Sequence, residues 1–111
     1  MPPPRLTDPH LQLELDVYYA QLQFRGGNLA ALRKLSRELR VKINVFEQWT
    51  SRTECPVPFQ TARHMRGTEL VTDDEWWTER RASFQADIGA LRQLAREYQA
   101  RIAEIVQRQD S

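Results

Sequence analysis

Large apolar side chains recur every seven residues in the last third of the chain, and this repeat most strongly limits the fold. The residues of the repeat, with those at the second apolar position, are Trp77, Phe84, Leu91, Tyr98 and Ile105, interleaved with Ile88, Ala95 and Ile102. Such a heptad pattern is the seam of a coiled coil, so we expect one helix over residues 72–109. At 1.5 Å per residue this helix is a rod of roughly 50 Å. Its apolar face must therefore meet another chain or the helices that precede it.

The sequence Thr72-Asp73-Asp74-Glu75 marks where this helix starts. It matches a capping box, in which a threonine hydroxyl and a glutamate carboxylate accept hydrogen bonds from otherwise free N–H groups. Acidic residues in a first turn also suit the helix dipole. Arg81 is the one residue that does not fit the apolar seam.

A first helix is expected after Asp8, which can serve as N-cap with Pro9 at the first helical position. Residues 1–7 are proline-rich, and we expect a disordered tail there. The helix would run to about Phe24. Apolar and polar residues also alternate over residues 11–19, which leaves a strand open, but a lone strand would find no partner in this chain.

Gly26 and Gly27 interrupt the pattern, since glycine permits positive φ at a helix end, and Asn28 can cap the next helix. Apolar residues continue to Trp49, so residues 28–52 form either one helix or two. Residues 53–71 are expected to form a loop, with Cys55-Pro56-Val57-Pro58 opposing a regular helix and a short helix over residues 59–65 still compatible with the pattern. A connection of this length is expected to pack against something or to bind something.

These patterns predict an all-α fold in which residues 8–111 make one domain: helices over residues 8–52, the loop, and the long helix. The 111-residue length suits one modest core, and 41% of the residues are hydrophobic. A single cysteine excludes an internal disulfide and a cysteine-rich metal cluster. No run of apolar residues reaches the length of a membrane span, and the start lacks a signal-peptide core. We therefore expect a cytoplasmic protein without a membrane partner.

Within residues 28–52 the side chains fit a helix-turn-helix at most diagnostic positions. Leu35, Leu39, Val41, Phe46 and Trp49 would be buried, Ser36 would lie where the helices cross, and the turn would fall at Arg40. The exposed face of the second helix would then include Ile43, Asn44 and Gln48, and Asn44 and Gln48 could pair with adenine edges in duplex DNA.

Basic residues are concentrated between Arg25 and Lys42, where Glu38 is the sole acidic residue, although the whole chain carries a net charge of +1. Arginines here could hold phosphates. The full set of candidate DNA-binding residues is Arg33, Lys34, Arg37, Arg40, Lys42, Asn44, Gln48 and Arg52.

The stretch from Asn28 to Arg52 resembles the helix-turn-helix of phage small terminase subunits and related phage DNA-binding regulators. The shared skeleton is Leu32, Leu35, Leu39, Val41, Phe46 and Trp49. The resemblance implies a phage protein that recognises packaging-site DNA as an oligomer. The sequence departs from the family pattern at the turn, where Arg40 stands in place of glycine, at a cost of about 1 kcal/mol or more for a left-handed backbone.

The alternative is one amphipathic helix over residues 28–52, packed antiparallel on the long helix as a helical hairpin. The chain would then be a non-enzymatic protein-interaction factor, such as an adaptor, a chaperone or a phage inhibitor of a host protein, and it would form homo-oligomers. Trp76, beside Trp77, is the candidate binding hot spot. The full set of candidate interaction residues is Trp76, Trp77, Phe84, Ile88, Leu91, Tyr98, Ile102 and Ile105.

No pattern in the sequence indicates catalysis. His10 and His64 are the only histidines, and neither has an acid or nucleophile at a meaningful spacing, so we expect both at the surface. Glycine-rich phosphate loops are absent. The sequence thus predicts no catalytic residue, no metal ligand, no cofactor and no small-molecule substrate.

Overall fold

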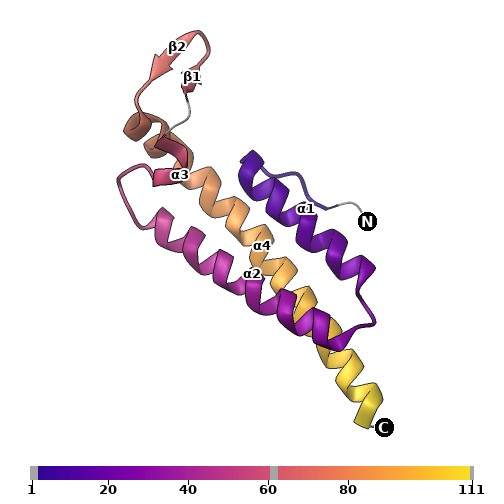
Figure 1. Cartoon of the computed structure of the whole chain (residues 1–111). Coiled ribbons are helices and arrows are strands. Elements are labelled where there is room, and N and C mark those ends of the chain that lie inside the picture. Colours follow the sequence, from indigo (N-terminus) through magenta and orange to yellow (C-terminus); the bar gives the residue numbers. More distant parts are fainter. Residues whose placement is uncertain (1–2, 61–62, 111) are drawn as a thin grey trace.

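The computed structural model describes residues 3–60 and 63–110, and its elements confirm the all-α fold class. In chain order they are α1 (Pro9–Phe24), α2 (Leu29–Thr50), α3 (Val57–Gln60), β1 (His64–Arg66), β2 (Glu69–Val71) and α4 (Asp73–Asp110). Helices α1 and α2 both lie along α4, while the small hairpin sits at one end of an elongated molecule measuring 60 × 25 × 20 Å (Figure 1).

The long C-terminal helix is confirmed, and its apolar seam faces the other helices of the same chain. Trp77, Phe84, Leu91 and Tyr98 are fully buried against residues of α1 and α2. Ile102 and Ile105 are only partly buried, on the last turns of α4, which extend past the α1–α2 turn (Figure 1). The intramolecular core therefore covers most of the face that a coiled-coil partner was expected to cover.

Each predicted helix start is formed by its predicted cap. The Asp8 carboxylate accepts hydrogen bonds from the N–H groups of His10 and Leu11, and the Asn28 side chain accepts one from Ala31. The Thr72 hydroxyl accepts one from Glu75 N–H at 3.2 Å, which is the threonine half of the predicted capping box. These bonds satisfy donors that a helix cannot satisfy by itself, so α1, α2 and α4 begin where local sequence dictates. Residues 11–19 are helical, as preferred over a strand.

The turn at Gly26 and Gly27 is present, but the predicted positive φ is wrong. Among the described residues Gly67 alone has a positive φ, at 63°. The turn is instead held from outside, because Arg101 Nε of α4 donates to the Gly26 carbonyl at 2.7 Å.

The predicted bend at Arg40 is wrong, since α2 runs unbroken from Leu29 to Thr50. Its buried residues keep one helical phase along α4, and a bend would break that contact. Two positions show the difference from the helix-turn-helix template. Val41, expected inside, is 62% exposed, and Ile43, expected on the recognition face, is 6% exposed. The helical hairpin of α2 on α4 is the arrangement that the chain adopts.

The segment over residues 53–71 is more ordered than the predicted loop. Helix α3 occupies Val57–Gln60, and β1 pairs with β2 antiparallel, with His64 opposite Val71. Gly67 supplies the left-handed residue of the hairpin turn. The sequence does not predict the hairpin, because its strands of three residues are too short for apolar and polar residues to show an alternating pattern.

Arg81 interrupts the seam because it caps α2. Its Nε and Nη2 atoms donate to the Thr50 carbonyl at 3.1 and 2.7 Å, at a helix end where carbonyls lack intrahelical partners. A cation there also suits the helix dipole. The buried Trp77 likewise donates its indole N–H to the Arg52 carbonyl at 3.0 Å.

The predicted disordered tail over residues 1–7 is wrong at its inner end, while Met1 and Pro2 lie outside the described residues. Leu6 packs against the core, and the N–H groups of Thr7 and Asp8 donate to the buried carboxylate of Asp87. The sequence showed the prolines, but it could not show that an acceptor on α4 lies beside this segment.

Two buried tyrosines predict that the chain loses stability at high pH. Burial, with Glu38 and Glu14 nearby, raises the pKa of Tyr18 to about 12, and burial also raises the pKa of Tyr98, whose hydroxyl donates to the Tyr18 carbonyl. A raised pKa means that folding favours the protonated phenol, so this stability is complete below about pH 10 and is lost as the pH rises through the folded pKa.

We expect urea midpoints to stay level up to about pH 10 and to fall as the pH rises further. Tyr98→Phe removes one of the groups, so this variant should show a smaller alkaline loss, although its stability at neutral pH is reduced by about 1 kcal/mol through the missing hydrogen bond. Equal slopes against pH for the two proteins would contradict the assignment.

Candidate functional site

Most of the predicted DNA-binding residues lie in solvent but do not form a recognition helix. Arg33, Lys34, Arg37, Arg40, Asn44 and Gln48 are exposed along α2, and Arg52 is exposed just after it. Lys42 differs, because its Nζ forms an ion pair with Glu14 of α1 at 3.2 Å. With no turn in α2, no second helix stands clear of the body to enter a major groove.

The structure removes most of the predicted interaction residues from reach of a partner. Trp77, Phe84, Ile88, Leu91 and Tyr98 are at most 1% exposed. Ile102 and Ile105 keep part of their surface. These buried side chains build the core, and the prediction that they bind a partner is wrong for the folded chain.

Trp76, the predicted hot spot, is also partly covered. Its ring stacks on His64 with centroids 4.1 Å apart, and it contacts Phe59 at 5.3 Å. The Arg80 guanidinium lies over the ring at 5.4 Å. Trp76 thus joins the hairpin to α4 and does not stand free for a partner.

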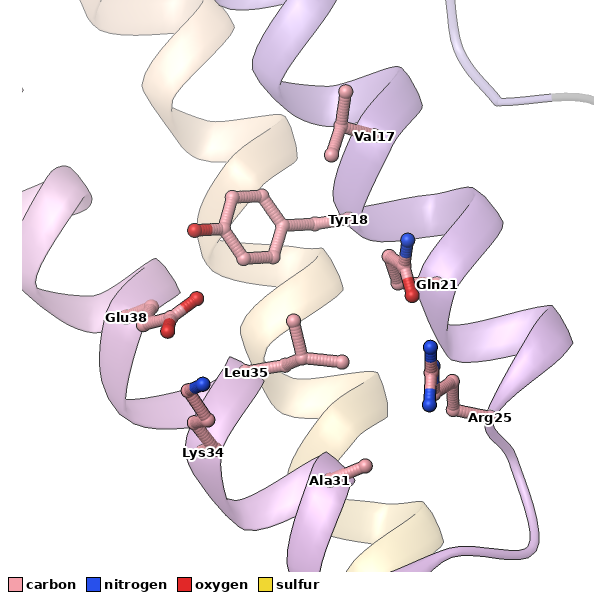
Figure 2. A pocket seen from close by; sticks show the side chains of 8 residues that line it. All are labelled: Val17, Tyr18, Gln21, Arg25, Ala31, Lys34, Leu35 and Glu38. Atoms are coloured by element: carbon pink, nitrogen blue, oxygen red, sulfur yellow. The ribbon is translucent and has the colours of Figure 1, made fainter.

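An open groove lies between α1 and α2, above α4, and we call it the α1–α2 groove (Figure 2). Its volume is about 370 Å³. Val17 and Tyr18 of α1 and Ala31 and Leu35 of α2 supply its apolar surface. Gln21, Arg25, Lys34 and Glu38 complete the lining. The groove exists because each helix packs mainly on α4 and the two contact each other little.

Exposed apolar side chains flank this groove on both helices. On α1, Leu13, Val17 and Phe24 are 62%, 47% and 88% exposed, and their spacings of four and seven residues place them on one face. On α2, Val41 and Val45 are likewise exposed and lie on one face. Large apolar side chains gathered on one surface mark an interaction site more reliably than scattered ones.

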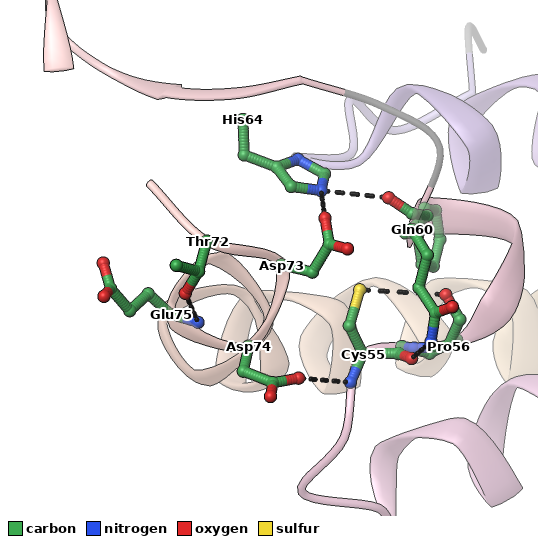
Figure 3. A network of polar contacts seen from close by, with 9 residues as sticks. Cys55, Pro56, Gln60, His64, Thr72, Asp73, Asp74 and Glu75 are labelled. Carbon is green, nitrogen blue, oxygen red and sulfur yellow. Dashed lines mark hydrogen bonds and ion pairs between the residues drawn. The ribbon is translucent and has the colours of Figure 1, made fainter. Parts of the chain in front are cut away.

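A second cluster of functional groups lies at the hairpin end, between α3, β1 and the start of α4 (Figure 3). Cys55, His64 and Asp73 each direct one metal-ligating atom to this point, and these three atoms lie within 4.8 Å of one another. His64 Nε2 is 3.1 Å from Asp73 Oδ1 and 2.9 Å from the Phe59 carbonyl oxygen. The expectation of a surface His64 without a nearby acid is wrong, because this side chain is 5% exposed.

Neighbouring groups hold this cluster in place. The Cys55 N–H donates to Asp74 Oδ1 at 3.2 Å, and Gln60 Nε2 donates to the Cys55 carbonyl at 2.7 Å. Burial raises the pKa of the Cys55 thiol to about 11, with Asp73 and Asp74 adding to the effect. A nucleophilic cysteine needs a lowered pKa, so this arrangement suits ligand binding better than attack on a substrate.

The sequence contains one feature of this cluster, a regular spacing, but that spacing does not indicate that the three side chains meet. Cys55, His64 and Asp73 are spaced nine residues apart, which matches no local helical or strand period. Only the hairpin and the return of the chain into α4 bring the three side chains together.

No family model, curated protein or solved structure matches the chain. Within the described residues, no helix has the length and apolar character that crossing a membrane requires.

Proposed function

We propose that this protein is a non-enzymatic interaction module that binds an acidic amphipathic helix of a partner protein in the α1–α2 groove. The observation that supports this proposal is the position of the exposed apolar residues on α1 and α2, along both sides of one open groove. Insertion of a partner helix's apolar face into a groove is a recurring mode of recognition.

The helix arrangement suits a fourth helix. Helices α1 and α2 rest on α4 and contact each other little, so one side of a four-helix arrangement is open. A helix laid on this side would cover Val17 and Leu35 at the groove and Leu13 and Val41 on its shoulders. Burial of such side chains contributes about 25 cal/mol per Å² of apolar area removed from water.

Charge around the groove favours an acidic partner. Arg25 and Lys34 line it, and Arg37 lies one turn of α2 from Lys34. Within the part of the chain that the structure describes, these three side chains form no ion pair. Glu38 is the one acid in the lining, and the other acid near Tyr18, Glu14, is paired with Lys42. Complementary charge at a groove rim mainly sets partner choice and association rate.

The proposal includes the setting in which the module works. A buried free thiol at Cys55 fits a reducing compartment such as the cytoplasm.

Two other functions compete with this proposal. The chain could self-associate through Ile102 and Ile105, or it could bind duplex DNA through the cations of α2.

The test uses two synthetic amphipathic helical peptides with the same leucine face, one carrying glutamates and the other lysines on its polar face. Amide shifts of the ¹⁵N-labelled protein should change around Val17 and Leu35 with the glutamate peptide and much less with the lysine peptide. Val17→Asp should weaken binding at least tenfold, whereas Val57→Asp, at a more exposed valine on α3, should have little effect.

Two other measurements distinguish the competing uses. Light scattering of the free protein should give the monomer mass, and gel shift with duplex DNA should show at most weak, salt-sensitive binding. Equal binding of both peptides, or shifts confined to the end of α4, would refute the groove proposal. Strong DNA binding that is lost in Arg37→Ala would instead support DNA binding by the basic residues of α2.

A further inference from the structure

Three different ligand-type atoms meet at the hairpin end, each brought by a different segment. Cys55 follows α2, His64 is the first residue of β1, and Asp73 is the first residue of α4. The sulfur, nitrogen and oxygen atoms lie within 4.8 Å of one another, and the Cys55 and His64 side chains are almost fully buried. We infer that Cys55, His64 and Asp73 form a zinc-binding site that fastens the hairpin to the helical body.

The distances suit a tetrahedral ion after a small closure. Zinc bonds of the usual length place nitrogen, oxygen and sulfur ligands about 3.3–3.6 Å apart along the edges of a tetrahedron. His64 Nε2 and Asp73 Oδ1 are already 3.1 Å apart. The sulfur, which donates to the Pro56 carbonyl at 3.7 Å in the metal-free chain, has to approach by roughly an ångström. Asp73 is the partly exposed ligand, at 39%, so a water on that side can complete the coordination.

The donor types select the metal. Magnesium and calcium prefer oxygen ligands, whereas a thiolate with an imidazole and a carboxylate suits zinc and its first-row neighbours. Asp74, next to Asp73, accepts a hydrogen bond from Cys55 N–H, and this bond holds a second negative charge close to the site. Together these groups favour a dication.

The ligands are positioned before any ion binds. Stacking of Trp76 on His64, with ring planes 14° apart, fixes the plane of the imidazole. Gln60 and Asp74 hold the backbone of Cys55 from both sides. Hydrogen bonds of this kind orient metal ligands, and their loss typically weakens metal binding 10–100-fold.

Zinc binding would rearrange protons in a defined way. In the metal-free chain His64 Nε2 lies near two acceptors, the Phe59 carbonyl and Asp73, so Nε2 carries the ring proton. On binding, that proton moves to Nδ1 through solvent, Nε2 becomes the ligand, and the Cys55 thiol releases one proton to water. Binding of zinc should therefore be accompanied by release of the Cys55 proton.

The β1–β2 hairpin is the part of the fold that this crosslink would stabilise. Strands β1 and β2 have three residues each and are exposed except at His64 and Val71. A two-stranded hairpin alone is marginally stable in water. Zinc would join the segment after α2, the hairpin and α4 at one point, and the hairpin would lose its freedom to detach.

The test is metal binding by the full-length, tag-free chain after removal of metals with a chelator. We expect one zinc ion per chain by competition with a chromophoric chelator, a thermal midpoint raised by several degrees, and a thiolate-to-metal charge-transfer band with cobalt. Cys55→Ser should abolish the cobalt band. Asp73→Asn and Cys55→Ser should each weaken zinc binding by more than the 10–100-fold typical of outer-shell losses.

His10→Gln is the matched control, because His10 is the only other histidine and lies on α1. This variant should bind zinc as the wild type does. Far-UV circular dichroism of each metal-free variant checks that the helices remain, and if a variant unfolds, the cobalt spectrum of the wild type decides the question. Absence of that band, or zinc affinity unchanged in Cys55→Ser, would overturn the inference.

Discussion

Leu91→Asp is expected to unfold the chain. Leu91 is fully buried at the centre of α4, among residues contributed by all three long helices. Truncating a buried leucine costs about 2–5 kcal/mol, and burying an unpaired carboxylate adds several more. Domains of this size have about 5–15 kcal/mol of stability in total. Far-UV circular dichroism at neutral pH should show the loss of most helical signal.

Ile102→Asp is the matched control on the same apolar seam, since it makes a comparable change of side chain on the part of α4 beside the α1–α2 turn. Ile102 is partly exposed, so its carboxylate can reach water, and we expect a loss of about 1–2 kcal/mol with the fold intact. If the seam instead served a coiled coil between chains, both variants would lower the mass measured by light scattering and leave helicity similar. That pattern would contradict the intramolecular core.

Trp77→Ala should have the second largest effect, a loss of about 3–5 kcal/mol in the free energy of unfolding. Trp77 is fully buried and contacts the rings of Phe59 and Phe84. Its removal opens a cavity at the junction of α2, α3 and α4. It also removes the indole N–H group that donates a hydrogen bond to the Arg52 carbonyl. Urea unfolding followed by circular dichroism measures the change.

The adjacent Trp76 offers a control with the same side chain and a different environment. Trp76→Ala removes the stacking on His64 and should cost about 1–2 kcal/mol, because this ring is only partly buried. The hairpin should loosen, seen as faster amide exchange at Val71, while the three-helix core keeps its protection. Equal losses for the two tryptophans would mean that the burial assigned to them is wrong.

The sequence alone determined the features that depend on nearest neighbours in the chain. Asp8 with Pro9, Asn28, and Thr72 three residues before Glu75 are local hydrogen-bonding patterns, and each cap forms where it was predicted. The seven-residue repeat likewise fixed the length of α4 and the residues on its apolar face. Apolar residues that recur at a helical period form one apolar face of the helix, whichever segment packs against that face.

Tertiary structure decided every feature that depends on which segments pack against each other. The apolar spacing of residues 28–52 suited both a bent pair and one helix, and contact along α4 selected the unbroken α2, which turned Ile43 inward and Val41 outward. The same packing buried the predicted interaction residues and left the α1–α2 groove as the open surface. The cluster of Cys55, His64 and Asp73 depends on chain reversals in the hairpin, so no local period could reveal it. Local rules act over about four residues, and both candidate sites are assembled from segments farther apart than that.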